Sequence, residues 1–206
     1  MSTHIDQLVL SAKSPAEFAK GYFAYLKSAL DGIPGASIAA LAQEFEDARA
    51  SGSTIFIAGN GGSATTATSM ANDLGFDVLK KSGTDRPFRL LALTDSNGMM
   101  TAISNDIGYD QVFVSQLRLH WRDGDRLLVI SASGNSQNLV VASEWVHERK
   151  GRVIALLGFD GGKLGRTSDV VVHVPSARGE YGPVEDAHLV LTHILAHWFQ
   201  VRLRGG

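Results

Sequence analysis

The chain has 206 residues, of which 44% are hydrophobic and 19% charged, and its formal net charge is −2. This length and apolar content suit one large domain with a substantial core, and the near-neutral charge argues against nucleic acid as a direct ligand. No apolar run reaches the ~20 residues of a membrane helix, no signal-peptide pattern opens the chain, and no cysteine is present for disulfides, thiolate chemistry or cysteine zinc sites. We therefore expect a cytoplasmic protein without a membrane partner.

Two helices are predicted ahead of the first strand. Residues 15–31 and 36–50 carry apolar residues at helical spacing and are separated by a Gly-Ile-Pro-Gly segment. We expect an antiparallel helical pair within residues 1–50, in the same domain as residues 51–206. Because such a pair adds little to a complete α/β layer, we also expect its apolar faces to contact other copies of the chain.

Strands and helices then alternate along the chain. Strands are predicted at residues 54–58, 88–94, 126–130, 153–157 and 170–174. Helices are predicted after the glycine-rich loop to about residue 72, and at 97–104, 110–120, 137–149 and, after an irregular connection at 176–183, 185–203. Near-continuous apolar strands in this alternation indicate an α/β fold, with a parallel sheet covered by helices on both faces.

The loop at residues 131–136 carries the clearest functional signal. It reads Ser-Ala-Ser-Gly-Asn-Ser and joins an apolar strand to an amphipathic helix. Free N–H groups at the helix start, the helix dipole and the hydroxyls of Ser131, Ser133 and Ser136 together favour an anion. Alternatively, Asn135 or Ser136 only caps the helix. A cap needs one hydroxyl and this loop has three, so we predict a cradle for the phosphate of a small molecule.

Other small polar residues follow neighbouring strands. In parallel sheets, ligands bind beyond the carboxyl ends of the strands. Asn60, Ser63 and Asp95 fall there, as does the 131–136 loop. The runs IFIAGNGGSA and LLVISASGNS both read as strand, small-residue loop and helix. We expect these two loops to hold the two ends of one phosphorylated substrate.

Two segments match nucleotide-binding motifs only in part. Residues 59–64 have the Gly-x-Gly-x-x-Ala form of a dinucleotide fingerprint, which also requires an acidic residue at the end of the next strand, about 20 residues on. Asp95 lies too far along, and Asp77 lies outside any predicted strand. A Gly-Lys pair resembles a P-loop, but Leu164 occupies the position of the magnesium-binding Ser or Thr.

A series of segments in fixed order carries a family resemblance. These are strand–AGNGGS–helix, TDSNGMMTAISND, strand–SASGNS–helix, GFDGGKLGRTSDVVVHVP and the final helix. Over about residues 54–200 the chain is similar to sugar isomerase (SIS) domain proteins, most of all to phosphoheptose isomerases. The resemblance implies a three-layer, doubly wound flavodoxin-like sheet and a homotetramer with pockets between subunits. It also implies isomerisation of sedoheptulose 7-phosphate to a heptose 7-phosphate through an enediol.

The resemblance also implies roles for particular residues. One group would bind the substrate: Asn60, Gly61, Ser63, Asp95, Ser131, Ala132, Ser133, Asn135 and Ser136. In a second group, His193 matches the general acid of the last helix, Asp73 matches the position of the base, and Glu185 is a relocated candidate for the base.

Three positions depart from the family pattern. Ser69 replaces a histidine, Asp73 replaces a glutamate four residues on, and Glu185 replaces a glutamine. In members that bind zinc, these positions and His193 supply the ligands, so the departures argue against a zinc site of the usual composition, and no cofactor is required. A divalent metal on Glu185, His188 and His193 stays open, since no spacing demands it.

Aldose–ketose isomerisation needs a base, an acid and stabilisation of the enediolate. Glu185 and His193 lie eight residues apart on one predicted helix, about 80° around its axis, so both are expected to border one cleft. Simpler interpretations exist. Glu185 in a first helical turn is favoured by the dipole, and Asp73 could pair with Lys80 or Lys81.

Two functions follow from these patterns. The leading hypothesis is a sugar-phosphate isomerase acting on a heptose phosphate. The alternative is a non-catalytic phosphosugar sensor or protein adaptor, of the replication-initiator-associating type, which keeps the serine loop and has lost the base. The changes at Ser69 and Asp73 motivate this alternative.

Overall fold

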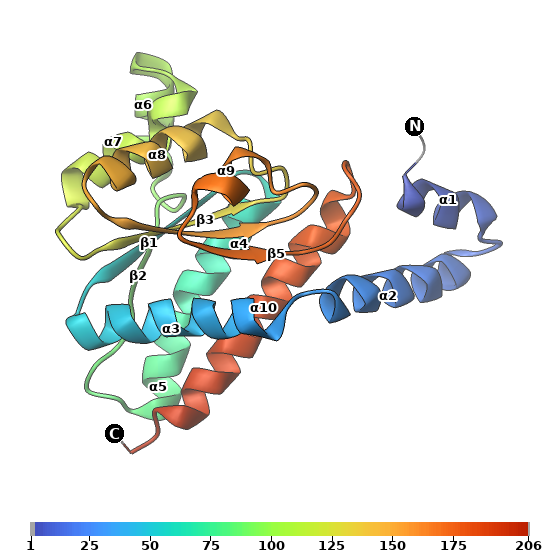
Figure 1. The fold of residues 1–206 in the computed structure, drawn as a ribbon, viewed down its shortest axis with the longest axis horizontal. Coiled ribbons are helices and arrows are strands. Elements are labelled where there is room, and N and C mark those ends of the chain that lie inside the picture. Colours follow the sequence, from blue (N-terminus) through green and yellow to red (C-terminus); the bar gives the residue numbers. More distant parts are fainter. Residues whose placement is uncertain (1–2, 206) are drawn as a thin grey trace.

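The computed structural model describes residues 3–205 and forms a five-stranded parallel sheet in the order β2-β1-β3-β4-β5 (Figure 1). The strands are β1 (Thr54–Gly59), β2 (Arg89–Ala92), β3 (Arg126–Ser131), β4 (Arg152–Leu157) and β5 (Val170–His173). The strand order reverses between β1 and β3, as in flavodoxin-like folds. The predicted α/β class and parallel sheet are confirmed.

Helices cover both faces of this sheet and give three layers (Figure 1). They are α1 (His4–Ser11), α2 (Pro15–Asp31), α3 (Gly35–Ser51), α4 (Gly62–Met70), the π-helix η1 (Ala71–Asp77), α5 (Val78–Ser82), α6 (Asn97–Asp106), the 3₁₀ helix η2 (Tyr109–Gln111), α7 (Val112–His120), α8 (Gln137–Glu148), α9 (Gly162–Thr167) and α10 (Tyr181–Arg202). Helices α3, α4, α5 and α10 lie on one face, and α7, α8 and α9 on the other. None of the helices in this part of the chain is long and apolar enough to cross a bilayer.

The strands are apolar on both faces because each face has its own core. Ile57 and Leu128 pack with Phe45 of α3 and with α10, whereas the alternate residues Phe56 and Leu127 pack with α7 and α8. Successive strand side chains point to opposite faces, so a strand buried on both sides needs an unbroken apolar run. This requirement explains why the strands could be predicted from such runs.

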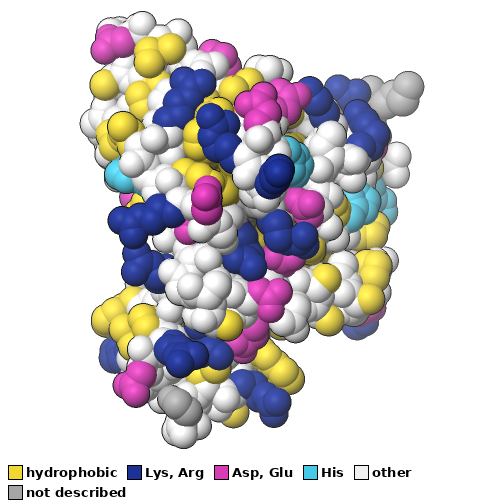
Figure 2. Space-filling view, turned by 60° about the vertical axis from the view of Figure 1, so that its left-hand side comes forward, with side chains coloured by type: hydrophobic (Ala, Val, Ile, Leu, Met, Phe, Trp, Pro, Cys, Tyr) yellow, Lys and Arg dark blue, Asp and Glu magenta, His cyan; other side chains and the backbone are white. Residues whose placement is uncertain are grey.

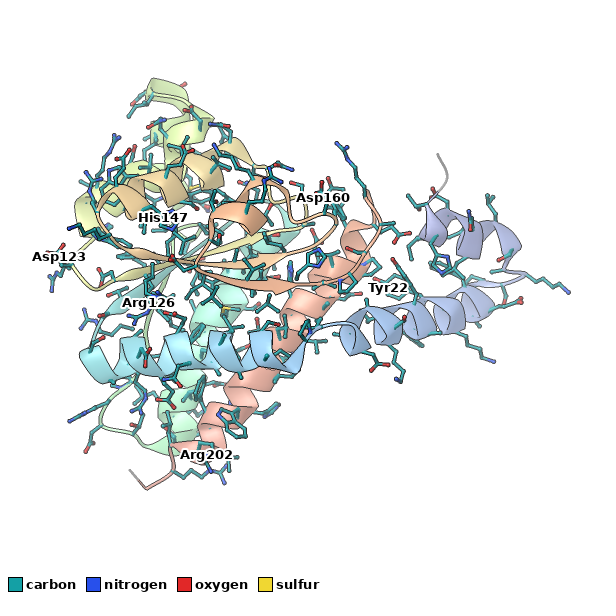
Figure 3. All side chains as sticks on the ribbon, viewed as in Figure 1. Tyr22, Asp123, Arg126, His147, Asp160 and Arg202 are labelled. Atoms are coloured by element: carbon teal, nitrogen blue, oxygen red, sulfur yellow. The ribbon has the colours of Figure 1, made fainter. Side chains whose placement is uncertain are left out.

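A buried ion network fixes α3 beneath the sheet. Glu44 of α3 is 6% exposed and accepts from Arg126 Nε at 2.9 Å and from Arg152. Figure 3 shows Arg126 between the sheet and α3. Since a buried carboxylate needs partners, the two guanidinium groups set where α3 crosses the starts of β3 and β4.

The expected antiparallel pairing of the N-terminal helices is wrong. Helices α2 and α3 run end to end, and α2 projects beyond the sheet (Figure 1). Gly32 ends α2 against Pro175, where a Cβ would lie 2.9 Å from Pro175 Cγ, and the extended Pro34 starts α3 without reversing the chain. Contacts at this junction, rather than the Gly-Pro composition, decide the direction of the chain.

Two helix boundaries differ from prediction and affect the site. Helix α10 begins at Tyr181 instead of residue 185. Pro183 is compatible with this earlier start, because a residue in the first turn needs no N–H partner. Glu185 therefore lies beyond the first turn. The helix dipole does not account for its position. The helix after the glycine-rich loop continues past residue 72 through η1, which contains Asp73.

Charge is evenly distributed on one face of the molecule. Figure 2 shows Lys and Arg side chains interspersed with Asp and Glu on the face that it presents. No continuous basic patch is visible on this face, in keeping with the net charge of −2.

Candidate active site

A cavity of about 290 Å³ lies at the carboxyl ends of β1 and β3, where the strand order reverses. Its lining residues are Asn60, Gly61, Gly62, Ser63, Ile130, Ser131, Ala132, Ser133, Ser136, Tyr181 and Glu185. Most of the predicted substrate-binding residues and one predicted base thus meet around one cavity. Gly62, Ile130 and Tyr181 were not predicted as site residues, and the AGNGGS motif offered a signal for Gly62 alone.

The serine loop, residues 131–136, is folded by its own hydroxyls. Ser131 Oγ accepts from the N–H of Gly134 at 3.1 Å, and Ser133 Oγ accepts from the N–H of Asn135 at 3.3 Å. Ser136 is the N-cap residue of α8, but its side chain makes no capping hydrogen bond. Helix capping therefore does not explain Ser136, which lines the cavity at the positive end of the α8 dipole.

Backbone contact with the next loop holds the serine loop in place. Gly134 has a φ of 63°, and a Cβ there would lie 2.0 Å from the carbonyl oxygen of Gly161. Gly162 has a φ of 55°, and a Cβ there would lie 2.4 Å from the carbonyl oxygen of Ser133. Only glycine fits both positions, so the backbones of the two loops interlock.

Two predicted binding residues do not line this cavity. Asn135 donates to the carbonyl of Ser133 at 2.9 Å and accepts from the N–H of Lys163 at 2.9 Å, so it ties the two loops together. Asp95 accepts from Thr68 Oγ1 of α4 at 2.5 Å. The structure does not bring either side chain to the serine loop's cavity.

Glu185 enters the cavity from α10. A Cβ on Gly62 would lie 2.3 Å from Glu185 Oε2, so the carboxylate sits against the glycine backbone at the start of α4. Burial raises the pKa of the Glu185 carboxyl above its ordinary value, and the neighbouring charge of Asp186 raises it further. A carboxylate with a raised pKa is a stronger base once it is ionised.

Helix α2 contacts the turn of α10 that carries Glu185. Tyr22 of α2 donates to Asp186 Oδ2 at 2.5 Å, and Figure 3 shows Tyr22 beside the start of α10. Burial and this hydrogen bond both raise the pKa of the Tyr22 hydroxyl, so it stays a donor throughout the neutral range. This turn of α10 thus contacts α2 through Asp186 and the backbone of Gly62 through Glu185.

The other two proton-transfer candidates meet outside this cavity. His193 Nε2 of α10 lies 3.5 Å from Asp73 Oδ2 of η1, and the two side chains are 55% and 22% exposed. Lys81 pairs with Asp77 at 3.2 Å rather than with Asp73. Glu185 and His193 of one chain do not border the same cavity, contrary to expectation, because eight residues also advance a helix by about 12 Å.

The π-helix that carries Asp73 was missed from the sequence. Residues of η1 follow an i→i+5 hydrogen-bond pattern, which changes the face that each side chain occupies. Gly75 in the helix interior is a weak signal for such a distortion. Because η1 packs against α10, which lies far along the chain, periodicity alone does not reveal its surroundings.

The residues of one chain do not fit a zinc site. Across residues 3–205, no group of three or more His, Cys, Asp or Glu side chains lies close enough together to hold a metal ion. Asp73 and His193 contact each other, Glu185 lines the serine-loop cavity instead, and Ser69 offers only a hydroxyl where the resemblance implies an imidazole. We therefore assign no step to a metal.

His188 is a core residue. Its side chain is 0% exposed, Nε2 lies 3.3 Å from the carbonyl oxygen of Leu157, and Nδ1 has no partner. Burial lowers the pKa of His188 to about 4. A neutral imidazole with its proton on Nε2 fits this environment, and it leaves His188 away from metal binding and proton transfer.

Buried His188 should make the fold sensitive to acid. The unfolded imidazole takes up a proton near pH 6.5 and the folded one near pH 4, so stability present above pH 6.5 falls as the pH drops through this window. We expect a loss of about 3 kcal/mol from this group, measured by urea unfolding at several pH values. His188→Leu should flatten that slope, and the exposed control His120→Leu should keep it. Equal slopes in both variants would contradict the assignment.

Comparisons with known proteins identify the family of the chain. The SIS domain family matches residues 21–158, so the fold described above is that of an SIS domain protein. Phosphoheptose isomerase of Chlorobium phaeobacteroides is 36% identical over 175 residues, which cover 84% of this chain and 76% of the relative. That of Colwellia psychrerythraea is 41% identical over 148 residues, 70% of this chain and 72% of the relative.

A solved structure extends the likeness to the whole fold. Phosphoheptose isomerase GmhA from Neisseria gonorrhoeae superposes with a TM-score of 0.78 at 31% identity, covering 90% of this chain and 98% of that one. The chain belongs to the phosphoheptose isomerase family. The resemblance stated from the sequence is confirmed.

Proposed function

We propose that the protein converts sedoheptulose 7-phosphate to a heptose 7-phosphate, an aldose–ketose isomerisation that runs through an enediol. Relatives that are 36% and 41% identical are named phosphoheptose isomerases, which supports the substrate. The observation that carries the proposal is the interlocked serine loop with a carboxylate, Glu185, in the same cavity. An anion cradle beside a candidate base suits a phosphorylated substrate with an acidic C–H.

The serine loop would bind the phosphate end. The cavity is lined by Ser131, Ser133 and Ser136, the last of which is the N-cap residue of α8. Asn60, Gly61 and Ser63 also line it and follow the adjacent strand β1. The sugar chain would extend from the serines toward this second loop.

The reaction moves one proton between neighbouring carbons. A base removes a proton from C1 of the ketose while an acid protonates O2, which gives the enediol. Loss of the O1 proton and return of a proton to C2 then give the aldose. His193 is the proposed acid, and Asp73 at 3.5 Å would orient and charge-stabilise its imidazole. Glu185 and Asp73 are the two candidates for the base.

We further propose a cytoplasmic homotetramer whose pockets lie between subunits. His193 is half exposed and does not line the cavity of its own chain, so a second copy would bring it to a serine loop. Exposed Ile194, Trp198 and Val201 continue along α10 and line an apolar groove of about 730 Å³ with α3. Such a surface suits contact between copies.

The choice of base has a direct test in Glu185→Gln. If Glu185 is the base, kcat should fall about 10²-fold or more in this variant. In the wild-type protein, the pH at which kcat/KM declines on the acid side should lie above the ordinary glutamate pKa, because the pKa of Glu185 is raised. Asp186→Asn should lower this pH, since the second cause of the raised pKa is removed. Full activity in Glu185→Gln would instead assign the base to Asp73.

The function itself is tested with phosphorylated ketoses of five to seven carbons, followed by NMR with and without a chelator. We expect an aldose phosphate from sedoheptulose 7-phosphate, with the same rate in chelator. No turnover of any ketose would overturn the proposal. Thermal stabilisation by the same sugars without turnover would then favour the non-catalytic sensor.

A further inference from the structure

A closed pair of carboxamides lies beside the cavity. Asn60 Nδ2 donates to Asn138 Oδ1 at 3.0 Å, and Asn138 Nδ2 donates back to Asn60 Oδ1 at 2.9 Å. Tyr109 Oη adds a second donor to Asn60 Oδ1 at 2.8 Å. Asn60 follows β1, Asn138 lies in the first turn of α8, and Tyr109 starts η2.

A backbone group fixes the orientation of both amides. The N–H of Leu139 donates to the side chain of Asn138 at 2.9 Å. A backbone N–H can only donate, so the Asn138 atom that faces it must be Oδ1. Because Asn138 is 3% exposed, its Nδ2 must face Asn60, and the atom of Asn60 that receives it must be the oxygen.

This orientation leaves Asn60 with one unused group. Its oxygen accepts two hydrogen bonds and one of its two amide protons is donated, so only the second N–H is free. Asn60 also lines the cavity. We infer that Asn138 and Tyr109 are positioning residues that make Asn60 a donor-only contact for an oxygen of the sugar.

The inference rests on the proposed isomerisation and specifies the atom recognised. Gly59 of β1 pairs with Ile130 of β3, so Asn60 and the serine loop follow adjacent strands. With the phosphate on the serines, the free N–H of Asn60 meets the sugar part of the ligand. A carbonyl oxygen that becomes an enediolate oxygen gains negative charge, and a fixed N–H stabilises it most in the transition state.

Kinetics separate this role from a general effect on binding. Tyr109 is 54% exposed, so Tyr109→Phe removes one hydroxyl without a buried defect. We expect kcat to fall about 2- to 10-fold, the worth of one hydrogen bond, and about 100-fold in Asn60→Ala. In both variants the inhibition constant of inorganic phosphate should stay unchanged. Asn105→Asp, an exposed amide on α6, is the control and should match wild type.

Two results would overturn the inference. An inhibition constant for inorganic phosphate that weakens in step with kcat would place Asn60 on the phosphate, and an unchanged kcat in Tyr109→Phe would show that the hydroxyl positions nothing.

A third readout does not depend on turnover. The ¹³Cγ signal of Asn60 should shift in ligand-free Tyr109→Phe, even if no ketose is converted, and an unmoved signal would contradict the hydrogen-bond arrangement.

Discussion

His193→Ala is expected to lower kcat by about 10³-fold while inorganic phosphate still binds with wild-type affinity. The imidazole is the proposed acid, whereas the phosphate would be held by a loop on β3 that His193 of the same chain does not reach. Steady-state kinetics with sedoheptulose 7-phosphate and inhibition by inorganic phosphate measure the two effects separately.

The control for this result is His120→Ala, an exposed histidine on α7 remote from α10. Its kcat and its inhibition constant for inorganic phosphate should match those of the wild-type protein. Two results would contradict the proposal that His193 transfers protons and the serine loop binds phosphate. One is a His193→Ala protein that retains more than half of the wild-type kcat, and the other is a His193→Ala protein that no longer binds phosphate.

Gly134→Ala is expected to have the second large effect, on the binding loop itself. The new Cβ would meet the carbonyl oxygen of Gly161 at 2.0 Å, and a φ of 63° strains any residue with a side chain. We expect about 2 kcal/mol or more to be lost from the free energy of unfolding, and phosphate affinity to fall more than about 10-fold as the loops separate. Urea unfolding and phosphate inhibition measure both quantities.

Gly98→Ala is the matched control for this substitution. Gly98 lies in α6 and a Cβ there meets nothing within 4 Å, so alanine should leave phosphate binding unchanged and raise helix stability slightly. A Gly134→Ala protein as stable as Gly98→Ala, with normal phosphate binding, would show that the interlocked loops do not organise the site.

Much of the fold could be predicted because its signals are local. Apolar runs such as those of β1 and β3 are buried on both faces, so the sequence needs no partner to reveal them. The serine loop could be recognised for the same reason, since its small residues and its glycine at a positive φ are adjacent in the chain.

What could not be predicted depends on contacts between distant segments. The direction of α2 is set where Gly32 meets Pro175, and the role of Tyr109 depends on Asn60, 49 residues away. Periodicity indicates which face of α10 is apolar, but not that Glu185 lines the serine-loop cavity while His193 lies outside it against Asp73. The eight residues between Glu185 and His193 rotate the chain about the helix axis and also advance it by about 12 Å along that axis.

We propose above all that a loop of serines presents a sugar phosphate to groups that move protons through an enediol. This proposal is tested most directly by incubating wild-type protein with sedoheptulose 7-phosphate in D₂O and following the sugar by NMR. We predict an aldose 7-phosphate that carries deuterium at C2, with exchange of a C1 proton in the remaining ketose. A sugar that binds but shows neither product nor deuterium would contradict the account.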